Sequence, residues 1–260
     1  MKKKKFSVFF VGTSSGKTSL KRFHSSLLLK SPDFNLLIDC GEGTSKALLA
    51  NKISHDTVDG ILFSHLHPDH SAGFASFIVQ IKQQKRKKPL KIFCHRNLVE
   101  VLKSFLSNSF VFTQKAAFSL EYFQFEHDEK ITVSKHIKLT SKQNTHLDKY
   151  LKYLSSESGF ASSSFLFEMG GEKIFYSGDI STYEDLFLFK EEKPKIIISE
   201  AAHITWEQIL DYYHLIKPEV IFLTHYSDEL EKKLKKKIFA LPQILHRKII
   251  LAEDGKYFQW

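Results

Sequence analysis

The stretch Ser64-His65-Leu66-His67-Pro68-Asp69-His70 places three histidines and one carboxylate within six positions. It follows the apolar run 60–63, which is typical of a buried strand. In an extended segment, side chains two residues apart point the same way, so the first two histidines can aim at one point. The proline ends the strand, so the aspartate and the last histidine can begin a helix and aim at a second point nearby. Imidazole and carboxylate are ligands of zinc and related divalent ions. The stretch therefore predicts a metal site.

Strand-like and helix-like segments alternate along the whole chain. Hydrophobic periodicity predicts strands at 6–12, 26–29, 35–39, 60–63, 91–95, 163–168, 173–176, 195–200, 219–225 and 248–252. Helices are expected at 44–51, 71–84, 97–110, 206–216 and, with an interruption at Pro242, 228–245. The alternation of residue types in 118–146 predicts antiparallel strands there. With no linker rich in Pro, Gly or Ser, the economical expectation is one α/β domain over 1–260.

Several of these predicted strands end in a residue that can bind metal. His146 closes the region 118–146, Asp179 follows the strand 173–176, and His225 ends the strand 219–225. His203 lies between the strand 195–200 and the next helix, and is a further candidate. Active sites of layered α/β folds gather at strand ends along one sheet edge. Asp39 also ends a strand, either orienting a metal-bound histidine or capping a helix.

The amino-acid composition narrows the kind of protein and the kinds of binding partner that are expected. The chain has 260 residues, 42% of them hydrophobic, which is enough to bury a sizeable core. Its two cysteines form no metal-binding pair and no disulfide framework, which fits a reducing, cytoplasmic location. No segment approaches the length that spans a membrane, and Met1 to Lys5 is interpreted as a basic lead-in to the first strand rather than a signal peptide. The formal charge of +9 favours anionic partners, including phosphate esters and nucleic acid.

Two further stretches suggest phosphate binding only weakly. Residues 12–18 (GTSSGKT) have three residues between the glycines where the phosphate-loop pattern needs four, so a turn between strands is expected. Residues 82–88 form the densest basic run. That run is either a solvated helix end, where cations suit the helix dipole, or a contact to a phosphate backbone.

With these motifs in view, the chain resembles the metallo-β-lactamase-fold hydrolases. The matching elements, in order, are Asp39-Cys40-Gly41, the HxHxDH pattern at 65–70, His146, Ser177-Gly178-Asp179 and Thr224-His225. Within that superfamily the chain is most similar to the ribonuclease Z-like phosphodiesterases. The additional matches are Gly12-Thr13-Ser14, Ser25-Ser26, the extension of the Asp39 motif to Thr44, Thr224-His225-Tyr226-Ser227 and Ala252-Glu253-Asp254-Gly255.

The resemblance implies a four-layered αββα sandwich with mixed sheets and a dinuclear site along one edge. It implies that one zinc ion is held by His65, His67 and His146, a second by Asp69, His70 and His225, and that Asp179 bridges the two. Mn²⁺ is the alternative metal. A metal-bound hydroxide would attack the substrate, with Asp69 helping to align it. The motif around His203 resembles the family's His-x-Thr element, whose histidine assists departure of the leaving oxygen. The plainer interpretation of His203 is a helix-capping or core residue.

The function expected on this basis is hydrolysis of a phosphodiester, in a cyclic nucleotide, a cyclic phosphate or a nucleic acid. Ribonuclease Z itself typically carries an arm between the third metal histidine and the bridging aspartate, which grips transfer RNA. The segment from His146 to Asp179 is too short for such an arm and is expected to be a local hairpin. The alternatives are a transfer-RNA 3′ endonuclease or DNA exonuclease, a thioester or lactone hydrolase, and a non-enzymatic nucleic-acid-binding scaffold. Homodimers are common among such relatives, so a homodimer is expected by analogy.

Overall fold

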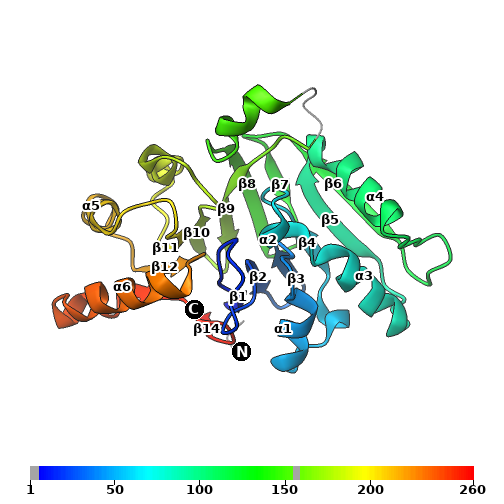
Figure 1. The fold of residues 1–260 in the computed structure, drawn as a ribbon, viewed down its shortest axis with the longest axis horizontal. Helices are drawn as coiled ribbons and strands as arrows, with labels where there is room; N and C mark the ends of the chain where they lie inside the picture. Colours follow the sequence, from blue (N-terminus) through cyan, green and yellow to red (C-terminus); the bar gives the residue numbers. More distant parts are fainter. Residues whose placement is uncertain (1–5, 155–158) are drawn as a thin grey trace.

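The computed structural model describes residues 6–154 and 159–260, so the basic lead-in 1–5 lies outside the described residues. Two seven-stranded sheets stack face to face (Figure 1). The first sheet has the order β14-β1-β2-β3-β4-β5-β6. Its strands are β1 (Ser7–Gly12), β2 (Ser26–Lys30), β3 (Asn35–Ile38), β4 (Gly60–Leu62), β5 (Leu90–His95), β6 (Leu120–Phe125) and β14 (Tyr257–Gln259).

The second sheet is built from the later part of the chain. Its order is β13-β12-β11-β10-β9-β8-β7. The strands are β7 (Lys130–Thr132), β8 (Ile137–Gln143), β9 (Ser163–Met169), β10 (Glu172–Tyr176), β11 (Ile196–Glu200), β12 (Val220–Thr224) and β13 (Ile249–Leu251). Strands β10 to β13 pair in parallel, whereas β7 to β10 pair antiparallel. In the first sheet, β14 to β3 pair antiparallel and β3 to β6 pair in parallel, so both sheets are mixed, as expected.

Among the described residues, alternation of side chains along the strands separates three hydrophobic cores. In β2, Leu27 and Leu29 pack between the sheets, whereas Leu28 faces the outer side of the first sheet. In β11, Ile198 packs between the sheets and Ile197 faces the outer side of the second. A sheet that is covered on both faces needs apolar residues on both, which explains why these strands are nearly continuous apolar runs.

Helices cover the outer face of each sheet. Helices α1 (Thr44–Ala50), α3 (Phe74–Gln83) and α4 (Val99–Asn108) lie along the first sheet, with the four-residue helix α2 (Pro68–Ser71) preceding α3 (Figure 1). Helices α5 (Trp206–Ile216) and α6 (Asp228–Phe239) lie on the second sheet. The order of layers is α, β, β, α, and the predicted four-layered sandwich is confirmed.

The expectation of antiparallel strands throughout 118–146 is wrong for its first strand. β6 pairs in parallel with β5 in the first sheet, from Leu90–Leu120 to His95–Phe125. The physical reason is the intervening α4, which returns the chain to the start of the sheet and so makes the next strand parallel. Only after β6 does the chain cross to the second sheet, where β7 and β8 do form an antiparallel pair.

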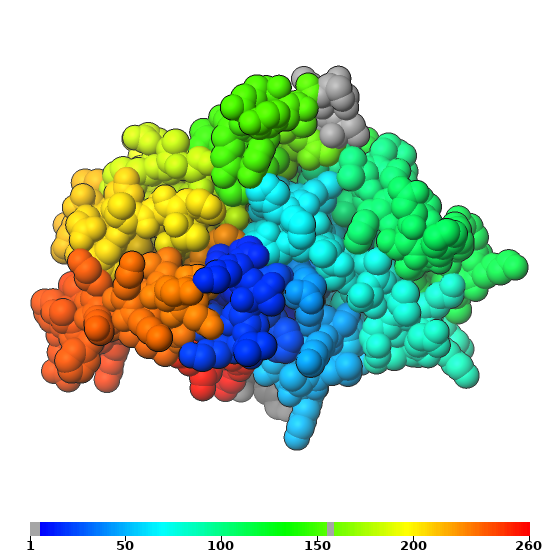
Figure 2. Space-filling model, in the orientation of Figure 1, coloured from blue at the N-terminus to red at the C-terminus, as the bar shows by residue number. Residues whose placement is uncertain are grey.

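The glycine-containing turn after β1 is a packed loop. Arg22 forms ion pairs with Asp228 and with Glu231, the latter at 2.9 Å, so the loop is tied to the start of α6. Figure 2 shows this N-terminal segment, in blue, lying against the orange α6. Residues 13–18 lie in the loop between β1 and β2, so the expected turn between strands is observed. In 6–154 and 159–260, no helix combines the length and apolar character needed to cross a membrane.

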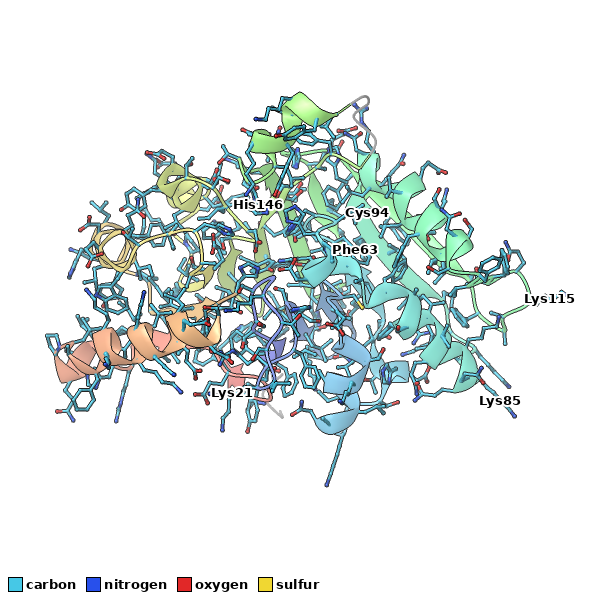
Figure 3. The ribbon with its side chains drawn as sticks, viewed as in Figure 1. Lys21, Phe63, Lys85, Cys94, Lys115 and His146 are labelled. Atoms are coloured by element: carbon cyan, nitrogen blue, oxygen red, sulfur yellow. The ribbon has the colours of Figure 1, made fainter. Side chains whose placement is uncertain are left out.

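The basic run 82–88 ends α3 far from the predicted site. Figure 3 places Lys85 at the outer end of that helix, whereas His146 lies near the middle of the molecule. Arg86 is buried and donates to the carbonyl oxygens of Lys88 and Pro89, both at 2.8 Å. Lys88 forms a 2.7 Å ion pair with Asp59. These contacts favour the structural interpretation of the run over a contact to substrate.

Candidate metal centre

The opening stretch folds as a turn between β4 and α2. His67 has an extended backbone (φ −58°, ψ 148°) and is the N-cap of α2, while the following proline occupies the first turn. The carboxylate of Asp69 then lies in the first turn of the helix, with His70 one residue on. The strand, proline and helix-start order expected from the sequence is therefore the observed one, and it directs the four side chains to two adjacent points.

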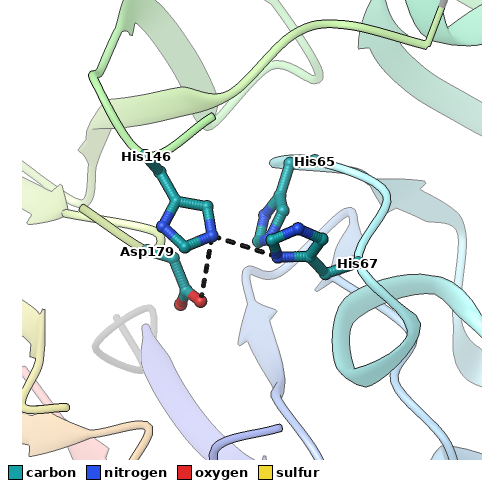
Figure 4. Close-up of side chains that lie close together, drawn as sticks. All are labelled: His65, His67, His146 and Asp179. Atoms are coloured by element: carbon teal, nitrogen blue, oxygen red, sulfur yellow. Dashed lines mark hydrogen bonds and ion pairs between the residues drawn. The ribbon is translucent and has the colours of Figure 1, made fainter. Parts of the chain in front are cut away.

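The first point is formed by His65, His67, His146 and Asp179, whose nitrogen and oxygen atoms lie within 4.8 Å of one another. Figure 4 shows the three imidazoles converging on the aspartate. Nε2 of His146 lies 3.0 Å from Nδ1 of His67 and 3.7 Å from Oδ2 of Asp179. Nε2 of His65 is buried and has no hydrogen-bond partner among the described residues. A buried polar atom of this kind needs a partner, and a metal ion would supply one.

The second point is formed by Asp69, His70, Asp179 and His225. Nε2 of His225 lies 3.0 Å from Oδ2 of Asp69 and 3.2 Å from Oδ2 of Asp179. Nε2 of His70 lies 3.2 Å from Oδ1 of Asp179. Asp179 thus belongs to both groups, with one carboxylate oxygen toward each of two neighbouring histidines. The donor set fits two divalent ions of the zinc type.

Asp39 orients an imidazole of this cluster. Its Oδ2 lies 2.8 Å from Nδ1 of His70, and its carboxylate also accepts from the backbone N–H and hydroxyl of Ser64 and from the hydroxyl of Tyr176. A carboxylate bound to Nδ1 fixes the tautomer that leaves Nε2 free to bind metal. Helix α1, by contrast, has Gly43 as its N-cap. Of the two interpretations of Asp39, the structure favours the orienting role over the capping role.

The electrostatics of the cluster favour neutral imidazoles at His65 and His146 beside an ionised Asp179. Burial lowers the pKa of His65 well below its usual range and that of His146 to about 4. Burial opposes ionisation of Asp179, but the nearby charges of His225 and His70 hold its pKa well below the usual range. His70 differs: burial disfavours its charged form, but Asp179 and Asp39 raise its pKa well above normal. The carboxylates of Asp179 and Asp39 therefore stabilise positive charge at His70. Either a proton or a metal ion would supply such a charge.

His203 stands at the rim of the cluster, after β11 and before α5. Its ring centroid lies 5.4 Å from that of His146 and 6.0 Å from that of His225. Nδ1 of His203 lies 3.0 Å from Oε1 of Glu200, and this hydrogen bond, which outweighs burial, raises the pKa of His203. Thr205, not His203, is the N-cap of α5, and about one third of the His203 side chain is exposed. It is therefore neither a capping nor a core histidine.

Glu200, His203 and His225 also form a third group of close donor atoms. The carboxylate of Glu200 already accepts hydrogen bonds from the backbone N–H groups of Ala202 and His203, at 2.6 and 3.0 Å, as well as from the His203 ring. Because the Glu200 carboxylate already accepts these hydrogen bonds, it is better suited to orienting His203 than to binding another ion.

A cavity of about 310 Å³ opens over the two groups. It exposes atoms of Asp69, Asp179 and His203, together with five residues that sequence reasoning did not single out as site residues: Ser15, Gly16, Lys149, Tyr150 and Ala202. The backbone of Gly16 lies close to the Asp69 carboxylate, since a Cβ at Gly16 would lie 3.4 Å from Oδ2 of Asp69. Of these, Ser15 and Gly16 belong to the turn 12–18 and Ala202 belongs to the motif around His203, whereas no sequence feature pointed to Lys149 or Tyr150.

Asp185 is a further residue that the sequence did not indicate. Its carboxylate accepts from the backbone N–H and hydroxyl of Thr145, the latter at 2.6 Å. It also accepts from the backbone N–H groups of Ser181 and Thr182. One buried carboxylate therefore ties the turn that carries His146 to the turn that follows Asp179, which fixes the spacing between these two donors.

Comparison with known proteins places the chain in a family. The family described as "Anti-Pycsar protein Apyc1" matches residues 6–247. The chain belongs to the Anti-Pycsar protein Apyc1 family. The match covers every residue of the two metal-binding groups, so the cluster lies within the part of the chain that defines membership.

Curated relatives include proteins named ribonuclease Z. Those of Saccharolobus islandicus and Saccharolobus solfataricus are 34% and 35% identical to this chain over 128 residues. The matched segment covers 49% of this chain and 43% of each relative, so the chain spans less than half the length of the curated relatives that it matches.

Solved structures of low sequence identity share the fold. The metallo-β-lactamase fold protein YhfI from Bacillus subtilis superposes with a TM-score of 0.77 at 19% identity, covering 99% of this chain and 100% of that one. Human tRNase Z, short form, gives 0.72 at 19% identity, covering 97% and 98%. Together with the curated relatives, these matches confirm the resemblance to ribonuclease Z-like hydrolases of the metallo-β-lactamase fold.

Proposed function

We propose that this chain is a metal-dependent phosphodiesterase whose cluster holds two divalent ions, zinc or alternatively manganese. The observation that carries the proposal is the position of Asp179, whose carboxylate is shared by two buried groups of histidines and aspartate. In this assignment His65, His67 and His146 hold one ion, Asp69, His70 and His225 hold the other, and Asp179 bridges them. Two such ions, when bound, supply positive charge to the phosphate oxygens and lower the pKa of the attacking water.

The chain's own residues then have separate tasks at the cavity. Burial opposes ionisation of Asp69, but the hydrogen bond from His225 holds its pKa at about 2, so it is an acceptor at neutral pH and can orient a water molecule. His203 has the opposite character, because its raised pKa favours the protonated form. Its Nε2 can donate to the leaving oxygen while Nδ1 remains on Glu200.

The size of the cavity supports a small substrate. Pockets for small molecules typically span about 300–1,000 Å³, and this one, at about 310 Å³, lies at the lower limit. Between His146 and Asp179 the chain forms the predicted hairpin of β9 and β10, with a short 3₁₀ helix before it, and no long arm lies among its described residues. We therefore favour a cyclic nucleotide or cyclic phosphate over a transfer-RNA precursor. The charge of +9 favours phosphate over a thioester or lactone.

The test begins with metal content. The purified chain should carry close to two equivalents of zinc or manganese, and His67→Ala and Asp179→Ala should lower that number. The matched control is His214→Ala, an exposed histidine on α5 outside the cluster, which should leave metal content unchanged. A folded, metal-free chain that still binds nucleic acid would instead support a non-enzymatic scaffold.

The same preparation is then assayed for substrate class. The panel contains bis(p-nitrophenyl) phosphate, 2′,3′- and 3′,5′-cyclic nucleotides, single-stranded DNA and a transfer-RNA precursor. A thioester and a lactone are included as substrates without a phosphodiester bond. Metal-dependent cleavage of cyclic nucleotides is the expected result. Activity confined to the thioester or lactone would overturn the phosphodiesterase proposal, and activity confined to the precursor RNA would overturn the preference for small substrates.

A further inference from the structure

The cavity has one wall that the proposed chemistry does not use, the 3₁₀ helix η3 (Asp148–Tyr153). It begins two residues after His146 and appears in Figure 1 as the short green helix at the top, next to the grey trace. Hydrogen bonds from Asp148 N to Thr145 O (3.1 Å) and from Tyr150 N to Leu147 O (2.8 Å) join it to the turn that carries His146. None of its own residues is buried. The helix is therefore fixed at its base and exposed along its length.

The sequence of η3 repeats a lysine–tyrosine pair, Lys149-Tyr150 and then Lys152-Tyr153. In each pair the ammonium group lies over the following ring, at 5.1 Å from the centroid of Tyr150 and 4.9 Å from that of Tyr153. In a 3₁₀ helix, residues three apart lie on the same face and about 6 Å apart along the axis. The two pairs are thus chemically alike but differ in their distance from the metal centre.

Only the first pair lines the cavity. Lys149 and Tyr150 both contribute to its wall, whereas Lys152 and Tyr153 do not. The ring of Tyr150 lies 5.7 Å from that of His67, at an interplanar angle of 90°, and the residue is 38% exposed. A cation and an exposed aromatic ring therefore stand together at the mouth of the candidate metal centre.

A nucleotide supplies the two groups that this pair can bind. A phosphate placed at the metal centre carries negative charge, which attracts a lysine ammonium more strongly than an aromatic ring does. The sugar and base must then extend from the phosphate toward the rim. Every nucleobase has a π-face, and stacking on an exposed aromatic side chain is a general mode of nucleotide binding.

We propose that Lys149 and Tyr150 form a nucleotide subsite, in which Tyr150 stacks on the base of the nucleotide whose phosphate lies at the metal centre and Lys149 pairs with that phosphate. The proposal rests on the proposed phosphodiesterase function and deepens it by assigning the two residues that recognise the base and the phosphate of a nucleotide substrate. Tyr150 binds the part of the substrate that does not react, so it contributes to affinity and selectivity rather than to the chemical step.

The experiment measures binding rather than turnover. Adenosine 5′-monophosphate and ribose 5-phosphate are titrated into the metal-loaded chain by calorimetry, because neither has a phosphodiester bond to cut and only the first has a base. The variants are Tyr150→Ala, Tyr150→Phe and Lys149→Met. Tyr153→Ala and Lys152→Met are the matched controls from the outer pair. Metal content is measured for each preparation, so that loss of the ions is separated from loss of the subsite.

The wild-type chain should bind the nucleotide more tightly than ribose 5-phosphate. Tyr150→Ala should weaken nucleotide binding roughly 10- to 100-fold and leave ribose 5-phosphate binding unchanged. Tyr150→Phe should retain the preference, because the ring is kept. Lys149→Met should weaken both ligands alike, and the two outer variants should resemble wild type.

Equal affinity of the wild type for the two ligands would overturn the subsite, as would equal losses in Tyr150→Ala and Tyr153→Ala. The two proposals fail separately. A chain that cuts phosphodiesters but shows no dependence on Tyr150 would refute the subsite alone. A chain that binds the nucleotide through Tyr150 but cuts no phosphodiester in the presence of zinc or manganese would refute the proposed function alone.

Discussion

The buried donor cluster and the exposed rim of the cavity are built in opposite ways. His65 and His70 are completely buried, and each is held by a hydrogen-bonding neighbour, Ser64 and Asp39 respectively. Tyr150 on the rim is 38% exposed and belongs to a helix with no buried residue. The donors can therefore keep one geometry, whereas the rim can change in sequence without disturbing the fold.

This difference separates chemistry from selectivity. Substitutions in the cluster should act on metal binding and on every substrate, because they remove ligands or the groups that orient them. Substitutions at the rim should act on particular substrates and spare the metal. The following predictions test that division, beginning with the largest expected effect.

Asp179→Asn should abolish cleavage of every phosphodiester in the panel. The amide keeps the shape of the side chain but removes the negative charge shared by the two groups. Metal content, measured by plasma mass spectrometry, should fall in parallel with activity. An Asp179→Asn chain that retained both its metal and its turnover would show that this carboxylate does not bridge the groups.

His203→Ala should lower kcat by about 10²- to 10⁴-fold, the usual contribution of a positioned acid or base. Because His203 lies outside the two metal-binding groups, metal content should match that of the wild type. Steady-state kinetics and metal analysis on one preparation check both points. Loss of metal in this variant would mean that His203 is a ligand and that its assigned role is wrong.

Asp39→Asn should reduce metal affinity by about 10- to 100-fold, as expected for a residue that orients a metal-binding histidine. The amide cannot stabilise charge on His70 as the carboxylate does. Competition with a chelator measures the effect, and Asp33→Asn, in the exposed turn between β2 and β3, is the control. If both variants lost metal equally, the hydrogen bond that His70 donates to Asp39 would have no special importance.

Glu200→Gln should change the pH profile. Hydrogen bonding to Glu200 raises the pKa of His203, so the proton that His203 donates is present below that raised pKa and is lost as pH rises through it. Activity should therefore fall on the alkaline side. Replacing Glu200 by glutamine removes the charge, lowers the pKa of His203 and should move this decline to lower pH. An unchanged alkaline limb of kcat would show that His203 does not supply the proton.

The sequence pointed to much of the cluster because several donors follow the end of an apolar strand. Buried strands are visible as uninterrupted hydrophobic runs, and a histidine or aspartate at such a boundary is unusual enough to notice. Asp179 and His225 follow β10 and β12 in this way, and the pairing of β10, β11 and β12 brings them to one edge.

The rim and some of the topology could not be anticipated in the same way. Lys149 and Tyr150 are exposed on a 3₁₀ helix that has no hydrophobic periodicity, so no pattern marks them. The short strand β14, which pairs with β1, is partly exposed and lacks an apolar run. The parallel pairing of β6 depends on the path of the chain through α4, which alternation of residue types cannot reveal.

The most direct test of the central claim is to locate the metal by anomalous X-ray scattering at the zinc edge in crystals of the zinc-loaded chain. The account predicts two peaks about 3.5–4 Å apart, the usual spacing of two-metal sites, with Asp179 between them. One peak should have His65, His67 and His146 as its neighbours, and the other should have Asp69, His70 and His225. A single peak, or two peaks that do not share Asp179, would contradict the account.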